Sequence, residues 1–320
     1  LYGFSLIYGL TGQLVFADIS AYLLANSLGS SPVLLLSAIL VISGIGFKIS
    51  VVPFHSWAPD TYEGAPLPIT AYLSVSSKAT GFVALIVLLT KVFESSGQSW
   101  GVILAIVAGA TMTLGNLVAL QQTNPVRLLA YSSISQAGFI IAPLAVSGIT
   151  GNYQDGIFAS VTYLIIYAFM NIGAFLSVHL FTNFTKSDNF YEWGGIAKHS
   201  PLTGVLTTVF FFSLAGIPPL GGWFAKFVVF RSLLSTGEII GISLAIVGAI
   251  NAVIALVYYA RISKVIWMDE LKNPEEEKSF EFQSPLKVVG ALTVLITFVA
   301  GIFPGIFSYL GEVSSIFFGN

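Results

Sequence analysis

Three lysines lie inside stretches of the sequence that are otherwise apolar: Lys48, Lys78 and Lys226. A charge in the hydrocarbon core of a membrane costs several kcal/mol, so such residues usually face a protein interior or a water-filled path. All fifteen Asp and Glu residues lie outside the apolar cores, in loops or at segment ends. Because a desolvated lysine has a lowered pKa and can exchange protons near neutral pH, the three lysines predict a proton path.

The composition indicates a polytopic, all-α membrane protein. Of its 320 residues, 55% are hydrophobic and 9% are charged, whereas soluble domains carry about 25% charged residues. The net charge of −2 gives no indication of a nucleic-acid partner. The chain has no cysteine, which excludes disulfides, cysteine-ligated Fe–S clusters and cysteine zinc sites. The three histidines are far apart in sequence and have no metal-ligand spacing: His55, His179 and His199.

The apolar segments predict one transmembrane domain over residues 1–320, embedded in a lipid bilayer. A spanning helix needs about 20 apolar residues. One partial and eight fuller segments approach this length: 1–12, 32–57, 66–92, 100–120, 127–149, 155–183, 201–235, 237–266 and 285–312. We therefore expect eight or nine spans. The chain opens without Met inside an apolar stretch, and we interpret it as the C-terminal portion of a longer protein.

Basic residues distinguish the two sides of the membrane. Alternate connections on one side contain Arg127, Lys186, Lys198, Arg261, Lys264, Lys272, Lys278 and Lys287. The other side has Lys91, with Arg231 near its end. Cytoplasmic loops carry an excess of Lys and Arg, so the first side is predicted to be cytoplasmic and the C-terminus to lie outside.

Two segments contain residues that interrupt helices. Pro53 follows Lys48 by five residues, and five Gly and Pro residues fall within 216–222, just before Lys226. Proline removes a backbone donor and clashes with the preceding turn. A broken helix at membrane depth is tolerated only where it lines a cavity or is buried in protein. We expect breaks at both places, with the second one clearer; an ordinary proline kink is the alternative, above all at Pro53.

The lysines also have a simpler explanation. A lysine near a helix end can extend its ammonium to the headgroups. Lys78 is about twelve residues from either end of its segment and cannot easily do so, whereas Lys48 can with strain. Lys48 and Lys78 are on consecutive segments joined by a short loop, so they can lie at similar depth and face each other.

Other polar groups accompany the lysines. After Lys48, His55 is a candidate proton relay because imidazole titrates near neutral pH; a hydrogen-bonded interfacial histidine is the alternative. Asp60 and Glu63 can cap a helix or pair with basic groups. A later segment concentrates polar groups that can order water or join helices: Tyr131, Ser132, Ser133, Ser135 and Gln136. Arg127 lies at the cytoplasmic end of this segment, where the positive-inside rule is enough to explain a basic residue.

Three long motifs carry a family resemblance: FKISVVPFHSWAPDTYEGAPLPITAYLSVSSK, GNLVALQQTNPVRLLAYSSISQAGF and SLAGIPPLGGWFAKF. They resemble the antiporter-like membrane subunits of respiratory complex I, most closely the N-type subunit, and the resemblance covers essentially the whole chain. Subunits of Mrp-type cation/proton antiporters share the first motif.

The resemblance implies a fold of about fourteen helices with inverted five-helix repeats, each containing one broken helix. It matches Lys48, Lys78 and Lys226 to the family's proton-translocating lysines. The family's partner glutamate for Lys48 falls before residue 1. Many members have histidine where this chain has Gln136, which cannot titrate but can orient water.

The resemblance therefore implies a proton-translocating membrane-arm subunit of an NADH:quinone oxidoreductase in an energy-transducing membrane, bacterial or archaeal. Its partners would be other complex I membrane subunits and protons. No cofactor is expected in this chain; NAD, FMN, Fe–S clusters and quinone would belong to partner subunits. One alternative is a ferredoxin- or deazaflavin-linked relative. The others are an Mrp-type Na⁺/H⁺ antiporter, disfavoured because sodium sites need oxygen ligands, and a structural scaffold.

Overall fold

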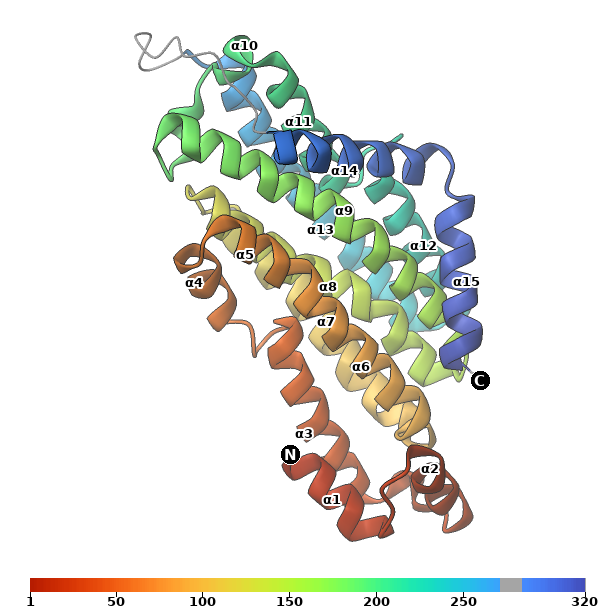
Figure 1. Ribbon diagram of the computed structural model, residues 1–320. Coiled ribbons are helices and arrows are strands. Elements are labelled where there is room, and N and C mark those ends of the chain that lie inside the picture. Colours follow the sequence, from red (N-terminus) through yellow and green to blue (C-terminus); the bar gives the residue numbers. More distant parts are fainter. Residues whose placement is uncertain (271–283, 320) are drawn as a thin grey trace.

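The computed structural model describes residues 1–270 and 284–319, and all regular structure in these ranges is helical (Figure 1). The α-helices are α1 (Tyr2–Thr11), α2 (Phe16–Ala25), α3 (Pro32–Ile49), α4 (Trp57–Gly64), α5 (Leu67–Tyr72), α6 (Lys78–Lys91), α7 (Gly97–Ala119), α8 (Pro125–Thr150), α9 (Tyr153–Thr185), α10 (Ile196–His199), α11 (Pro201–Ala215), α12 (Gly221–Ser235), α13 (Ile239–Met268), α14 (Ser284–Ile302) and α15 (Gly305–Gly319). Short turns are η1 (Leu28–Ser30), η3 (Glu94–Ser96) and η4 (Phe190–Trp193), and a π-helical turn, η2 (Leu73–Ser77), joins α5 to α6.

The chain is a multi-pass membrane protein. Among the described residues, seven helices are long and apolar enough to cross a membrane, or eight if the bent pair α1 and α2 is one span. The broken pair α11 and α12 adds a further apolar segment, as expected from the run 201–235. Large apolar side chains remain exposed along the outer helices, such as Ile246, Ile250 and Val253 on α13, which suits a surface that faces lipid or another subunit.

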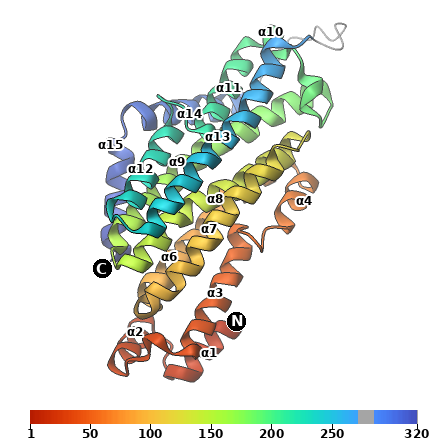
Figure 2. The same cartoon turned by 180° about the vertical axis from the view of Figure 1, so that it is seen from behind.

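Helix α8 lies at the centre of the bundle, between α7 and α9 (Figures 1 and 2). Every residue from Ser132 to Gly148 is buried. The Asn124 side chain accepts hydrogen bonds from the backbone N–H groups of Val126 and Arg127, which caps the start of α8. Helix α9 runs beside it and contacts α5, α11, α12, α14 and α15. Polar residues on the facing sides of α8 and α9 therefore lie in the protein interior.

Both predicted helix breaks are confirmed, and their backbones match. Helix α3 ends at Ser50 (φ 60°) and α11 ends at Gly216 (φ 96°), both left-handed. The N–H groups of Val51 and Ile217 each bond back five residues, to the carbonyls of Gly46 and Phe212, the closing bond of a Schellman motif. A cis X–Pro bond follows in each break, at Val52–Pro53 and Pro218–Pro219. The break near Pro53 is thus as complete as that near Pro218, contrary to the expectation that the second would be clearer.

Two other features differ from the predicted segments. Residues 16–25 form α2, which lies outside the apolar segments predicted from the sequence. The run 285–312 was expected to be one helix, but it divides into α14 and α15 at Phe303 and Pro304. Both pieces pack along α9. The division was not predicted because the run is apolar throughout. Pro304 was the available signal, since it has no backbone N–H and cannot continue the hydrogen-bond pattern of α14.

Candidate functional site: two buried lysines joined through α8 and α9

Lys78 is the first residue of α6 and is 2% exposed. Its Nζ donates to Ser133 Oγ at 2.6 Å and to the Ser133 carbonyl oxygen at 3.2 Å, both on α8. The same Nζ lies 5.9 Å from the ring centroid of Tyr62 on α4, a cation–π distance. Among the described residues, no carboxylate forms an ion pair with Lys78. The ammonium is therefore held by neutral groups.

The π-helical turn η2 places Lys78 in this position. Single π-helical turns inside α-helices are rare and are frequent at functional sites. Ser74, within η2, accepts a hydrogen bond of 2.8 Å from Asn171 Nδ2 on α9. Ser74 and Asn171 are both fully buried. This contact anchors the turn to α9 and fixes the direction in which Lys78 leaves the helix.

Lys226, 4% exposed, is bound to the end of the half-helix α11. Its Nζ donates to the carbonyl oxygens of Ala215 at 2.5 Å and Leu214 at 3.2 Å. The last carbonyls of a helix have no intrahelical partner and carry partial negative charge. Breaking the helix at Gly216 therefore creates a binding place for an ammonium group inside the protein. Lys226 Nζ also lies 5.2 Å from the ring centroid of Phe139 on α8.

Gln136 joins Lys226 to α9. Its Nε2 donates at 3.2 Å to the Leu214 carbonyl oxygen, which also accepts from Lys226. Its Oε1 accepts a hydrogen bond from the hydroxyl of Tyr163 on α9. The Tyr163 ring stacks on Phe139, with centroids 6.2 Å apart. Gln136 thus has both ends of its amide engaged, and it connects the half-helix to the tyrosine.

A row of polar residues on α9 extends from the Lys226 site toward the Lys78 site. Tyr163, Tyr167 and Asn171 are spaced by four, so they lie on one face of the helix. Tyr163 bonds to Gln136 near Lys226, and Asn171 bonds to Ser74 near Lys78. Tyr167, between them, is 1% exposed. The hydroxyls of Tyr167 and Tyr62 both approach Ser133, the residue that binds Lys78.

A second polar branch leaves α8 on its other side. The hydroxyls of Ser132 and Tyr259 are hydrogen-bonded to each other. The adjacent Tyr258 donates to Asn116 Oδ1 on α7 at 3.0 Å, and Asn116 Nδ2 donates to Asn251 Oδ1 at 3.0 Å. Ser132 and Ser133 are neighbours in sequence, so this branch starts beside the Lys78 contact.

Lys48 does not join these groups. It lies in the last turn of α3 and is exposed, with its methylene groups against Gly81 of α6. No described segment covers that side of α3, so the expectation that Lys48 faces a protein interior stays a prediction. Lys48 also does not face Lys78, whose ammonium points to α8.

The other predicted site residues have mixed positions. Ser135 is buried where α8 approaches Gly115 of α7. Tyr131 is only partly buried. His55 is half-buried in the break after α3, and its Nδ1 has no hydrogen-bond partner. Among the described residues, none of these three side chains forms a hydrogen bond with Lys78 or Lys226. Within the described part of the chain, no group of three His, Asp or Glu side chains is placed to hold a metal ion.

Several groups of the site were not predicted from the sequence, above all Tyr62, Tyr163, Tyr167, Asn171 and Ser74. A signal was present, because tyrosine and asparagine recur every four residues within the apolar run of α9. That periodicity shows that the residues share a face but not which neighbour the face meets. The α9 row became recognisable only through its contacts with α8 and η2.

The fold and the two buried lysines define an antiporter-like membrane protein. The chain belongs to the NADH:quinone oxidoreductase/Mrp antiporter transmembrane family, whose model matches residues 1–254. It is 36% identical over 305 residues to NADH-quinone oxidoreductase subunit N of Desulforamulus reducens, and this match covers 95% of the chain and 61% of the relative. It is 42% identical over 311 residues to NAD(P)H-quinone oxidoreductase subunit 2 of Crocosphaera subtropica, with 94% and 58% covered.

A solved structure has the same fold. A chain of respiratory complex I from Thermus thermophilus with bound aureothin superposes with a TM-score of 0.75 at 28% sequence identity. This match covers 96% of the chain and 64% of the solved chain. The chain therefore spans about three fifths of the length of the curated relatives that it matches.

Proposed function

We propose that this chain is the N-type membrane-arm subunit of a complex I-type NADH:quinone oxidoreductase, and that it moves protons through the interior of the bundle. The observation that carries the proposal is the pair Lys78 and Lys226, both buried and bound to neutral groups. The similarity to subunit N of Desulforamulus reducens supports the choice of complex. In this proposal, electrons pass through other subunits, where NAD, FMN, Fe–S clusters and quinone would be bound.

The chemistry requires each lysine to alternate between a charged and a neutral form. Burial penalises the charged form of an amine, and a proton-transfer group works best when neither form strongly dominates. Lys226 has the carbonyls of α11 to stabilise its ammonium, and Lys78 has Ser133 and the Tyr62 ring. A proton leaving Lys78 would move along the hydroxyls of Ser133, Tyr167 and Tyr163 and the water between them to Lys226. Gln136 would orient water on this path.

Lys48 has a different role in this proposal. Its exposed position suits a fixed positive charge that pairs with a carboxylate outside the described residues. The side chains of His55 and Ser135 would help to order water near the proton path. Tyr131 would do the same at the end of the path. The protein as a whole would act as a single transmembrane domain.

The test uses Lys78 variants in the assembled complex. Lys78→Met and Lys78→Arg should each lower proton uptake into inverted vesicles roughly tenfold or more, per amount of assembled complex. The arginine variant matters because a guanidinium does not deprotonate in proteins. Lys91→Met, at the other end of α6, removes a partly buried lysine and should pump normally. If Lys78→Arg pumps like wild type, Lys78 is only a fixed charge and the proposal is wrong.

An Mrp-type antiporter is the second candidate, because the family includes these antiporters. A sodium site needs oxygen ligands, usually carboxylates. Every buried charged side chain in the described residues is a lysine. Proton movement should therefore persist when Na⁺ is replaced by choline in the vesicle buffer. A strict dependence on Na⁺ would favour the antiporter instead.

A further inference from the structure

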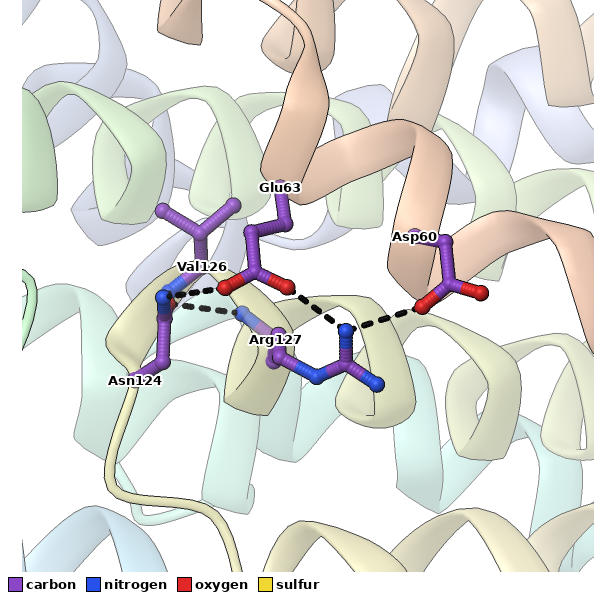
Figure 3. Close-up of polar contacts among 5 residues, drawn as sticks. All are labelled: Asp60, Glu63, Asn124, Val126 and Arg127. Carbon is purple, nitrogen blue, oxygen red and sulfur yellow. Dashed lines mark hydrogen bonds and ion pairs between the residues drawn. The ribbon is translucent and has the colours of Figure 1, made fainter.

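A charged corner joins α4 to the start of α8 (Figure 3). Arg127 Nη1 contacts Asp60 Oδ1 at 2.8 Å and Glu63 Oε2 at 2.6 Å. Asn124 Nδ2 donates to the other Glu63 oxygen at 3.0 Å, while Asn124 Oδ1 caps α8. We call the four residues Asp60, Glu63, Asn124 and Arg127 the corner. The positive-inside rule explains why Arg127 is positively charged, but it does not explain these specific contacts with Asp60 and Glu63.

The corner acts on a short helix that follows a break in the chain. Helix α4 has eight residues, and isolated helices this short are not stable in water. It follows the break after α3, so no helical hydrogen bonds connect it to that span. Two side chains secure it elsewhere: Trp57 Nε1 donates to the Phe47 carbonyl oxygen at 2.8 Å, and Thr70 Oγ1 donates to the Tyr62 carbonyl oxygen at 2.9 Å.

The two faces of α4 have different surroundings. Asp60 and Glu63 are exposed, whereas Tyr62, between them in sequence, is fully buried. The Tyr62 ring lies 5.9 Å from Lys78 Nζ and meets Phe175 of α9 edge-on at 6.3 Å. The rotation of α4 about its axis therefore decides whether Tyr62 lies over Lys78, and the corner contacts the exposed face of the same helix.

We propose that the corner is a positioning site for Lys78: Arg127 and Asn124 hold the carboxylates of α4 so that Tyr62 stays against the Lys78 ammonium. This inference rests on the proposed role of Lys78 in proton transfer. Exposed ion pairs contribute little stability, so the corner matters chiefly for the geometry of α4. Arg127 is a positioning residue, since it acts through Tyr62 and touches no group of the proton path.

The first experiment measures coupling. Arg127→Gln should lower the number of protons pumped per electron about twofold or more. A factor of about two is the lower limit of the interaction expected between residues in contact. Lys198→Gln is the control, because it removes one exposed positive charge expected on the same side of the membrane. The double variant Glu63→Gln/Arg127→Gln should be no worse than Arg127→Gln, since both changes open the same contact. A double variant that multiplies the two single losses would overturn the inference.

The second experiment separates positioning from simple loss of structure. Ala58 on α4 is fully buried, and the chain has no native cysteine. Ala58→Cys in the assembled complex should react slowly with a maleimide, followed by mass spectrometry of this chain, and faster when Arg127→Gln is added. Asn124→Asp keeps the cap of α8 but removes the donor to Glu63, so it should also accelerate labelling. Unchanged labelling with both variants would mean that the corner does not hold α4.

The two proposals fail differently. If Lys78→Met abolishes pumping while Arg127→Gln pumps with the normal ratio, only the positioning role is wrong. If Lys78→Met itself pumps normally, the proposed function is wrong, and the labelling experiment still reports whether the corner holds α4.

Discussion

At the scale of single residues, the two buried tyrosines of α9 have different partners. The Tyr163 hydroxyl is bonded to Gln136 beside Lys226. The Tyr167 hydroxyl, one turn away, approaches Ser133, which binds Lys78. Tyr167 is therefore placed between the two lysine sites.

Tyr167→Phe should therefore lower activity much more than stability. Removing one buried hydroxyl should cost only about 1 kcal/mol, so the melting temperature of the assembled complex should change little. Proton uptake per assembled complex should fall roughly tenfold or more if Tyr167 connects the two lysines. Tyr163→Phe, which removes the hydrogen bond to Gln136 Oε1, should lower both quantities. The idea fails if Tyr167→Phe pumps normally.

Gly216 offers a second test at this scale. Its φ of 96° is left-handed, and a Cβ there would lie 2.7 Å from Lys226 Cδ. Gly151 is also left-handed (φ 77°), but a Cβ there would meet nothing within 4 Å. Alanine at either position costs about 1–2 kcal/mol for the backbone conformation, whereas only Gly216→Ala displaces Lys226. Thermal unfolding should detect both variants, and proton uptake should fall only for Gly216→Ala. Equal proton uptake in both variants would contradict this role of Gly216.

At the scale of elements, η2 and its anchor on α9 decide where Lys78 points. Asn171→Ala removes the hydrogen bond to Ser74, which should lower the free energy of unfolding by about 1–3 kcal/mol. It should also reduce pumping, because the π-helical turn can relax. Asn183 lies further along the same helix and is bonded to His179 at an exposed position, so Asn183→Ala should change stability by less than about 0.5 kcal/mol. Normal pumping by Asn171→Ala would show that η2 holds its shape without this contact.

The elements also show what the sequence could predict. Apolar runs predicted the spans, Pro53 predicted the break after α3, and the clustered Gly and Pro at 216–222 predicted the break after α11. All of these signals are local in the chain. The division between α14 and α15 was missed because Phe303 and Pro304 continue an apolar run. The position of Lys48 and the contacts of Tyr62 depend on how segments pack around them, so no spacing along the chain could reveal them.

At the scale of the whole molecule, the two lysines are on helices from the two halves of the described chain, each next to a broken span. Lys78 lies in α6, beyond the break that ends α3, and Lys226 lies in α12, directly after the break that ends α11. The polar residues of α8 and α9 lie between them. This arrangement indicates one path with the lysines in series rather than two separate paths.

A double variant distinguishes these two arrangements. Lys78→Met and Lys226→Met should each reduce proton uptake strongly. If the lysines act in series, the double variant should pump no less than the more impaired single variant, because either change already blocks the same path. Separate paths would each retain partial pumping in the single variants, and the double variant would lose both parts. The measurement is proton uptake per electron in vesicles, normalised to assembled complex, with Lys91→Met as the control. A double loss equal to the sum of two partial losses would contradict the single path, since independent sites contribute additively.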